Sequence, residues 1–237
     1  KEYQTRFTAY ELPLLSKIKA ESLYYRMMIF ERLFPFYLAI GVLLLAGLIA
    51  MVMKGKKSVL LFTKILGWIL FAGFLLHTLG LGLRWYISGH SPMSNGYESM
   101  IFISWVTLLA GFVFSRKSSF VLPATAVLSG LTLLVAHLSF MDPEITNLVP
   151  VLQSYWLTLH VSVITSSYGF LGLGAILAII VMILLSLSGK TNLERISSTI
   201  DDLTVINYKS LTIGLYMLTI GTFLGAVWAN ESWGRYW

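Results

Sequence analysis

The sequence predicts an all-α integral membrane protein, a polytopic helical bundle with about six transmembrane helices plus an N-terminal interfacial helix. Of its 237 residues, 57% are hydrophobic and only 12% are charged, about half the charged share of a soluble domain. So little polar surface cannot cover a globule, and apolar side chains must therefore face lipid. Six apolar stretches also approach the length of about 20 residues that a helix needs to cross a bilayer. Continuous runs of this length indicate helices, because only helices and closed barrels satisfy the backbone in lipid.

The N-terminal segment, residues 1–33, lacks a continuous apolar core, and we expect it to be an amphipathic interfacial or linker segment. Leu15, Ile18, Tyr25 and Ile29 form a pattern typical of a helix that lies on the membrane surface. The chain starts without Met and stops directly after a tryptophan-rich stretch, so we expect it to be a piece of a longer polypeptide.

The apolar stretches that follow define a transmembrane domain over residues 34–229. The third expected helix is short and should borrow residues from Asn95–Ser99. The fifth could reach about 50 Å at 1.5 Å per residue, so it should tilt or project beyond the bilayer. The six helices are expected at about residues 34–53, 59–83, 100–115, 120–140, 156–188 and 211–229.

Loop charges predict the orientation of these helices, because cytoplasmic loops carry an excess of Lys and Arg. One face has Arg84, Arg235 and the acidic loop 141–155. The number of membrane crossings also places segment 1–33 on this face, and glutamates lie between the basic residues of that segment. The other face, which we assign to the cytoplasm, carries Lys54, Lys56, Lys57, Arg116, Lys117, Lys190, Arg195 and Lys209.

The composition excludes several kinds of chemistry. The chain has no Cys, which rules out disulfides, thiolate metal sites and thiol chemistry by this chain. Its net charge of +6 is dispersed between apolar runs, whereas a nucleic-acid binder gathers such charge on one face. The sequence holds no zinc-type HExxH motif, phosphate loop or GxSxG motif. Chemistry by a bound cofactor is therefore favoured over chemistry by side chains.

The stretch from Trp228 to Trp237 holds three Trp and a Tyr on the face that we expect to lie outside the cytoplasm. One interpretation is an aromatic belt, since Trp and Tyr concentrate at membrane interfaces. The other is a shaped aromatic shelf, because polar residues and Arg235 interleave the rings. Such a shelf would suit a flat, apolar ligand that carries carboxylates.

All four histidines fall in the outer half of the membrane or beyond it. His160 follows Trp156 by one turn, and an ionisable residue at membrane depth is a functional hypothesis; the alternative is an interfacial histidine solvated by headgroups. His77 and His137 are interpreted as hydrogen-bond donors in helix packing. His90 lies in a turn rich in Gly, Pro, Ser and Asn, where it orients a neighbour or faces solvent.

Three segments carry a resemblance to a known family. They are the run RWYISGHSPMSNGYESMIFISW from Arg84 to Trp105, the run SYWLTLHVSVITSSYG around His160, and the ending WANESWGRYW. Together they resemble the CcsA-like (ResC-like) heme-handling WWD proteins of system II cytochrome c maturation. The upstream run KIKAESLYYRMMIFERLFPFYL resembles the segment that joins the CcsB-like and CcsA-like parts of bacterial CcsBA fusions, and residues 228–237 match the start of the WWD motif, truncated.

The resemblance implies a holocytochrome c synthase of the heme-lyase type. Such a protein transports heme b to the outer face of the bacterial inner membrane or presents it there, and it promotes thioether attachment of the heme to the Cys-x-x-Cys-His segment of apocytochrome c. The resemblance implies two external histidines as axial ligands of the heme iron: His160, and a second that follows the WWD motif and is not in this sequence. The resemblance does not assign the other histidines, and our own candidates for supporting residues are Arg84, His90, Glu98 and His77. Either Arg235 or Arg84 could pair with the heme propionates. Implied partners are a CcsB-like part or subunit, thiol-reducing proteins and the lipid bilayer. The heme-binding WWD surface would comprise Trp228, Asn230, Trp233, Gly234, Arg235, Tyr236 and Trp237.

Two alternatives remain open at this point. One is a heme exporter or chaperone without synthase activity. The other is a small-solute transporter, which predicts broken helices or paired charges near the midplane. Beyond Lys64, which can snorkel to the interface from a helix end, the sequence offers no such charge.

Overall fold

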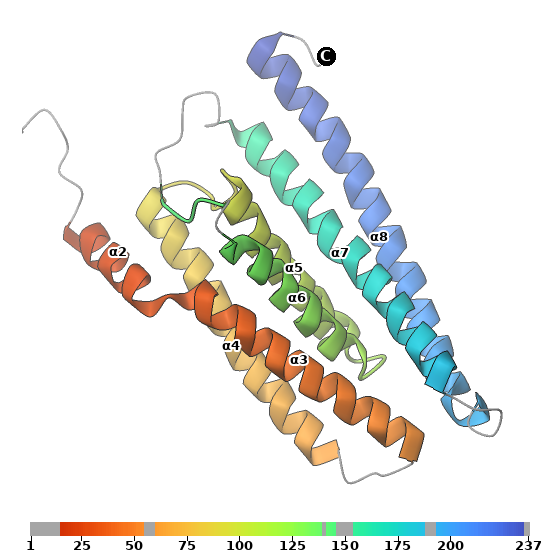
Figure 1. The fold of residues 1–237 in the computed structure, drawn as a ribbon. Coiled ribbons are helices and arrows are strands. Elements are labelled where there is room, and N and C mark those ends of the chain that lie inside the picture. Colours follow the sequence, from red (N-terminus) through yellow and green to blue (C-terminus); the bar gives the residue numbers. More distant parts are fainter. Residues whose placement is uncertain (1–14, 55–59, 139–140, 146–153, 188–192, 235–237) are drawn as a thin grey trace, which may run out of the picture.

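The fold is a bundle of helices, as the sequence predicts, and a computed structural model describes it for residues 15–54, 60–138, 141–145, 154–187 and 193–234 (Figure 1). These residues contain no strand. Their helices are α2 (Leu15–Met27), α3 (Ile29–Lys54), α4 (Leu60–Ser88), α5 (Gly96–Phe114), α6 (Val121–His137), α7 (Tyr155–Leu187) and α8 (Leu193–Trp233).

The helices are long and apolar enough to make this a multi-pass membrane protein. Five helical stretches meet the length and composition that a membrane span needs: Leu15–Val52, Leu61–Ser88, Gly96–Phe114, Tyr155–Leu187 and Ile196–Trp233. The helix α6 is apolar but has only 17 residues. It packs against α3 and α5, and nine of its residues are buried.

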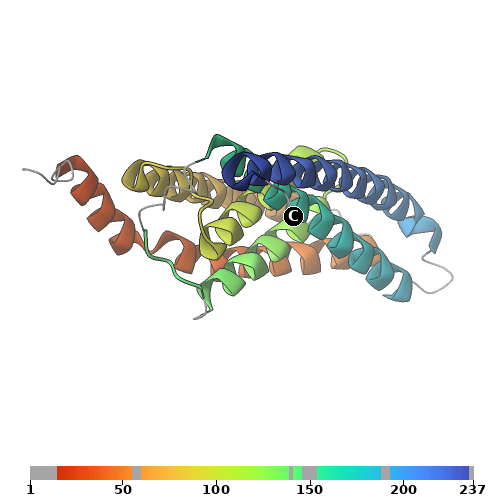
Figure 2. The same ribbon diagram turned by 90° about the horizontal axis from the view of Figure 1, so that it is seen from above.

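Helix α2 leaves the direction of α3 and packs against the end of α4, where its Tyr24 is buried. Met28 has a φ of +45° and separates α2 from α3; such a φ is uncommon for a residue other than glycine and interrupts the helical path. Figures 1 and 2 show α2 projecting sideways at one edge of the molecule. Leu15, Ile18 and Tyr25 are exposed, while Ile29 is buried against the bundle. The interfacial position of this segment stays a prediction.

Helices α3 to α6 pack around polar contacts as well as apolar ones. Ser104 on α5 and Ser129 on α6 each donate a hydroxyl to the other's backbone carbonyl, at 3.1 and 2.9 Å. Small side chains at such crossings let membrane helices approach closely. Helix α5 also contacts α7, and this contact joins the four helices to the long antiparallel hairpin of α7 and α8 (Figure 1).

Two helices begin before the continuous apolar runs from which they were predicted. Helix α5 begins at Gly96, as expected if it borrows residues upstream, because Asn95 caps it: the Asn95 side chain accepts a hydrogen bond from the Glu98 backbone N–H at 2.8 Å. Helix α8 begins at Leu193 rather than at residue 211. Its first half is amphipathic, so a search for apolar runs misses it.

Candidate functional site

The candidate site lies at the end of the bundle where α7 begins and α8 ends, which we call the His160 end. In the antiparallel α7–α8 hairpin, the first turns of α7 face the last turns of α8 (Figure 1). This places His160 against Gly221, and the His160 Nδ1 atom lies 2.7 Å from the Gly221 carbonyl oxygen. A carbonyl can only accept, so Nδ1 must carry the proton in this contact.

The hydrogen bond fixes the chemistry of the opposite ring nitrogen. When Nδ1 of a neutral imidazole carries the proton, Nε2 keeps its lone pair. Within the described part of the chain, His160 Nε2 has no hydrogen-bond partner. A histidine that donates one nitrogen to a backbone carbonyl and offers the other as a lone pair is the usual arrangement of a metal-ligating histidine.

Gly225 makes room for the imidazole. A Cβ atom at this position would lie 2.7 Å from His160 Cε1 and 2.9 Å from Nδ1, closer than side-chain atoms tolerate. Gly221 and Gly225 form a GxxxG pattern within an apolar helix, which is a sequence signal for close helix approach. A close helix contact at these two glycines is therefore predictable from the sequence, whereas its partner His160 is known only from the fold.

The aromatic residues continue this face of α8. Trp228 follows Gly221 and Gly225 at helical spacing, so all three point toward α7. Its indole N–H is buried and finds no acceptor among the described residues. Buried polar groups normally have partners, so this donor is an exception among the described residues. Trp233 lies against Trp228 with ring centroids 4.9 Å apart and the rings inclined at 62°.

The rest of the aromatic segment is partly described. The helix α8 continues through Trp233 and ends at Gly234, whose φ of +69° suits glycine and whose N–H donates to the Asn230 carbonyl at 2.9 Å. Asn230 and Glu231 are exposed. The structure therefore brings Trp228, Trp233 and His160 to one end of the hairpin. Three predicted site residues lie outside the described residues: Arg235, Tyr236 and Trp237.

Arg84 and Glu98 form a buried ion pair at the same end of the bundle. Arg84 Nε donates to Glu98 Oε1 at 2.6 Å, and both side chains are almost fully buried. Glu98 Oε2 accepts from the Ser94 backbone N–H at 2.7 Å and from the Ser94 hydroxyl at 2.6 Å. The carboxylate thus ties the loop before α5 to the end of α4.

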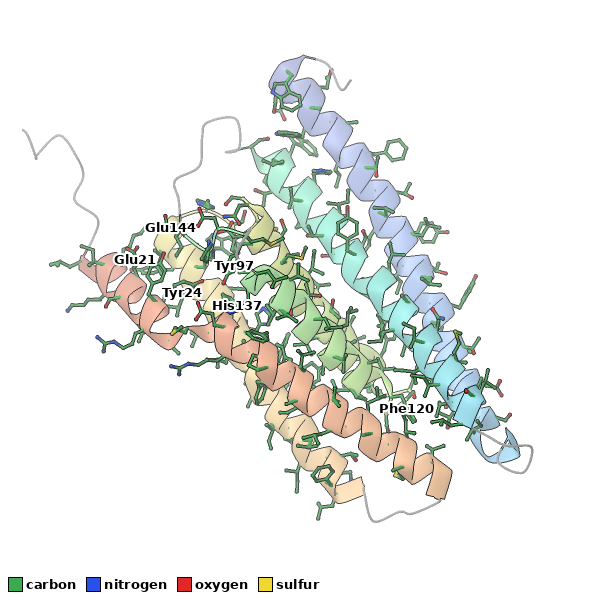
Figure 3. All side chains as sticks on the ribbon, in the orientation of Figure 1. Glu21, Tyr24, Tyr97, Phe120, His137 and Glu144 are labelled. Carbon is green, nitrogen blue, oxygen red and sulfur yellow. The ribbon has the colours of Figure 1, made fainter. Side chains whose placement is uncertain are left out.

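The other Arg84 donors bind two further segments. Nη1 donates to the Tyr24 hydroxyl at 3.1 Å and to the Pro143 carbonyl at 2.8 Å, and Nη2 donates to the Glu144 carbonyl at 2.9 Å. With the bond to Glu98, four contacts engage a guanidinium that has five N–H groups. Figure 3 shows Tyr24, Tyr97 and Glu144 gathered in this region. Arg84 joins α2, α4, α5 and residues 141–145, so a supporting role for it is one of positioning.

The loop between α4 and α5 connects this cluster to α7. The Ser91 hydroxyl lies 3.3 Å from the Thr158 hydroxyl, two residues before His160. His90 Nδ1 contacts the Ser91 carbonyl oxygen at 3.0 Å. The loop that carries His90 therefore braces the first turn of α7, on which His160 depends for its position.

The remaining two histidines lie elsewhere in the bundle. His77 is fully buried among α3, α4 and α5, with Nε2 3.0 Å from the Ile101 carbonyl oxygen and Nδ1 3.3 Å from the Tyr37 hydroxyl. Both nitrogens are thus engaged, which fits helix packing. His137 is exposed at the end of α6, where its ring stacks on Phe34 with centroids 5.1 Å apart. The structure brings neither of them to His160.

The donor set at the His160 end fits a heme better than a bare metal ion. Among the described residues, no three His, Asp or Glu side chains are grouped to hold a metal. A heme needs only one or two axial ligands from the protein, and His160 Nε2 has the lone pair that such a ligand requires. The indole rings of Trp228 and Trp233 offer apolar surface at the same end of the hairpin.

Fold and site define a multi-pass membrane protein that exposes an imidazole and aromatic rings at one end of a helical hairpin. The chain belongs to the cytochrome c assembly protein family, whose profile matches residues 93–237. It is 52% identical over 231 residues to protein NrfI of Wolinella succinogenes, covering 95% of this chain and 25% of that protein. It is 38% identical to the cytochrome c biogenesis protein CcsA of a Synechococcus species and to that of Prochlorococcus marinus, over 69% of this chain. The chain spans only 63% and 61% of those two proteins.

Proposed function

We propose that this chain holds heme b at the non-cytoplasmic face of the membrane and presents it for covalent attachment to apocytochrome c. Membership of the cytochrome c assembly family supports a role in this pathway. The observation that carries the proposal is the hydrogen bond from His160 Nδ1 to the Gly221 carbonyl at 2.7 Å, because it leaves Nε2 ready to bind iron.

In this proposal His160 is an axial ligand and the WWD residues form the surface on which the macrocycle rests. Trp228 and Trp233 pack against the ring, and the buried Trp228 N–H donates to a polar group of the ligand. Asn230, Gly234, Arg235, Tyr236 and Trp237 complete that surface. Arg235 pairs with the heme propionates, since Arg84 already has four partners within the protein. His77 supports the site only through the core, where both its nitrogens are engaged.

The chain contributes proximity and orientation to the attachment reaction. The heme supplies two vinyl groups, to which the thiols of the Cys-x-x-Cys-His segment add to form thioether bonds. His160 and the indole rings hold these vinyl groups in one place, while the absence of Cys from this chain leaves no thiol to compete with those of the substrate. Holocytochrome c synthase activity would require regions outside these residues, including a second axial ligand.

The proposed setting follows from the same role. Heme, an apocytochrome c with a Cys-x-x-Cys-His segment, a CcsB-like part or subunit and thiol-reducing proteins are the expected partners. The reductants are needed because thioether formation consumes cysteine thiols, which an oxidising compartment would pair as a disulfide. The expected location is the bacterial inner membrane, with the site on the periplasmic face.

The test is to replace His160 by Ala in the full-length protein and to record the heme Soret band after purification in detergent. We expect the band to be lost and to return in part when exogenous imidazole fills the vacated position. His137→Ala, which changes an exposed histidine at a different helix end, is the matched control and should keep the band. Retention of an unchanged band by His160→Ala would remove the ligand assignment.

A second measurement separates a synthase from an exporter or chaperone. The heme-loaded, purified protein is mixed with a reduced Cys-x-x-Cys-His peptide, and covalent heme on the peptide is measured after acid extraction. A synthase transfers heme to the peptide covalently. A pure exporter or chaperone yields only heme that acid extraction removes.

A further inference from the structure

A large cavity lies at the end of the bundle opposite His160. It has a volume of about 500 Å³, which is within the range of about 300–1,000 Å³ that small-molecule sites occupy. The cavity lies between the last turns of α3 and α5 and the first turns of α4 and α6. In Figure 3, Phe120 marks this end of the bundle, far from the cluster around Tyr97.

The walls of the cavity are apolar and aromatic. Leu44 and Leu48 of α3 line one side. Trp68 and Phe71 of α4 line the other, with ring centroids 5.9 Å apart, and Phe71 meets Phe112 of α5 at 5.5 Å. Trp68 is 73% exposed. It stands on a transmembrane helix, so the mouth of the cavity opens toward the hydrocarbon of the bilayer rather than toward the bundle interior.

The rim of the cavity is polar and carries a cation. Lys64 lines it together with Ser115 and Ser119, which flank the turn between α5 and α6. No acidic residue lies on α4 or in this turn, and within the described part of the chain no carboxylate pairs with Lys64. Arg116 and Lys117, exposed in the same turn, add further positive charge. The cavity thus combines an apolar interior with an uncompensated cation and hydroxyl groups at its edge.

We propose that this cavity binds an acidic phospholipid of the bilayer. An acyl chain lies against Leu48, Trp68 and Phe71, and the headgroup phosphate accepts hydrogen bonds from the Lys64 ammonium and the Ser119 hydroxyl. Charge complementarity selects an anionic headgroup over a zwitterionic one, because the ammonium of a zwitterionic lipid would meet Lys64 and the basic turn. The proposal does not depend on the heme site, which lies at the other end of the bundle.

Trp68 provides a direct probe, because a brominated acyl chain quenches tryptophan fluorescence only on contact. The full-length protein is placed in phosphatidylcholine vesicles, and brominated phosphatidylglycerol or brominated phosphatidylcholine is added at increasing mole fraction. The difference between the wild-type protein and Trp68→Phe isolates the Trp68 signal. Trp85, which is 57% exposed at the opposite end of α4 and does not line this cavity, gives the matched control through Trp85→Phe.

For each brominated lipid we determine the mole fraction that quenches half of the Trp68 signal. We expect this mole fraction to be lower for phosphatidylglycerol than for phosphatidylcholine, by a factor on the order of five. The Trp85 signal should not distinguish the two lipids, and Lys64→Gln should remove the difference at Trp68. Equal quenching of Trp68 by both lipids, or an unchanged preference in Lys64→Gln, would overturn the proposal. Heme binding is read separately from the Soret band, so a failed heme assignment leaves this result unaffected.

Discussion

Substitution of Gly225 by Ala should displace the His160 imidazole. The added Cβ would lie 2.7 Å from His160 Cε1, 2.9 Å from Nδ1 and 3.2 Å from Nε2. Carbon atoms in contact normally stay about 3.5–4.0 Å apart, so the ring must move by roughly 1 Å. A shift of that size stretches the 2.7 Å hydrogen bond between Nδ1 and the Gly221 carbonyl beyond the limit of about 3.2 Å for an N–H···O bond.

The lost hydrogen bond should weaken heme binding without removing the ligand. Partners that orient a metal-bound histidine are worth about 10- to 100-fold in metal affinity. We therefore expect Gly225→Ala to lower heme affinity by about that factor, measured by titrating the heme-stripped full-length protein with hemin and recording the Soret band. Exogenous imidazole should restore less of the band than in His160→Ala, because the displaced ring still obstructs the position.

The control for this experiment is Gly214→Ala on the same helix. Its Cβ would intrude to a similar degree, 2.9 Å from a Leu171 side-chain carbon, but it meets no part of His160. Heme affinity should stay near that of the wild-type protein in this variant. If Gly225→Ala binds heme as tightly as the wild-type protein, or if both variants lose affinity equally, the positioning of His160 by α8 is refuted.

Three further predictions concern the stability of the protein in detergent, read as the melting temperature of the purified chain. Glu98→Ala leaves the Arg84 guanidinium buried without its partner and should lower the free energy of unfolding by about 3–5 kcal/mol. Glu98→Gln keeps a hydrogen-bond acceptor, so it should lower the free energy of unfolding by less. Equal losses of stability in the two variants would refute a role for the charge. His77→Ala opens a cavity and leaves the Tyr37 hydroxyl and the Ile101 carbonyl without their hydrogen-bond partner, so it should lower the free energy of unfolding by about 2–5 kcal/mol. The Soret band of the folded fraction should stay unchanged. An altered band would place His77 at the heme. Trp228→Phe should leave the melting temperature of the heme-free protein near that of the wild type. The packing lost with the indole is offset by removal of a buried N–H that has no partner among the described residues and so lowers the free energy of unfolding by about 1–3 kcal/mol. A fall in melting temperature as large as that of Trp228→Ala would show that this N–H has a partner.

The sequence predicts the transmembrane helices well where their apolar runs are continuous. The capping chemistry of Asn95 even accounts for the early start of α5. The first half of α8 escaped prediction because only one of its faces is apolar: Ile196, Leu203 and Ile206 are buried at helical spacing, between polar residues that face away. A test for amphipathic periodicity, rather than for hydropathy alone, finds this part of the helix.

The candidate site was predictable in its residue types but not in its contacts. The histidine and the tryptophans could be identified because ionisable and aromatic residues stand out in an apolar chain. Arg84 and Glu98 were candidates as well, but the contacts of Arg84 could not be predicted, because its partners Tyr24, Glu98 and Pro143 lie 60, 14 and 59 positions away from it in the sequence. Only the folded bundle brings these residues together. In it Arg84 binds groups of the protein, whereas the sequence alone left Arg84 as a candidate to pair with the heme propionates.

The most direct measurement of iron ligation by His160 is electron paramagnetic resonance of the ferric heme in the full-length His160→Cys variant. Cysteine introduces a thiolate where these 237 residues have no other sulfhydryl group, and a thiolate axial ligand changes the electronic structure of heme iron. We predict that the spectrum of the wild-type protein, typical of imidazole ligation, is replaced in this variant by one typical of thiolate ligation. An imidazole-type spectrum that persists unchanged in His160→Cys would show that another residue binds the iron.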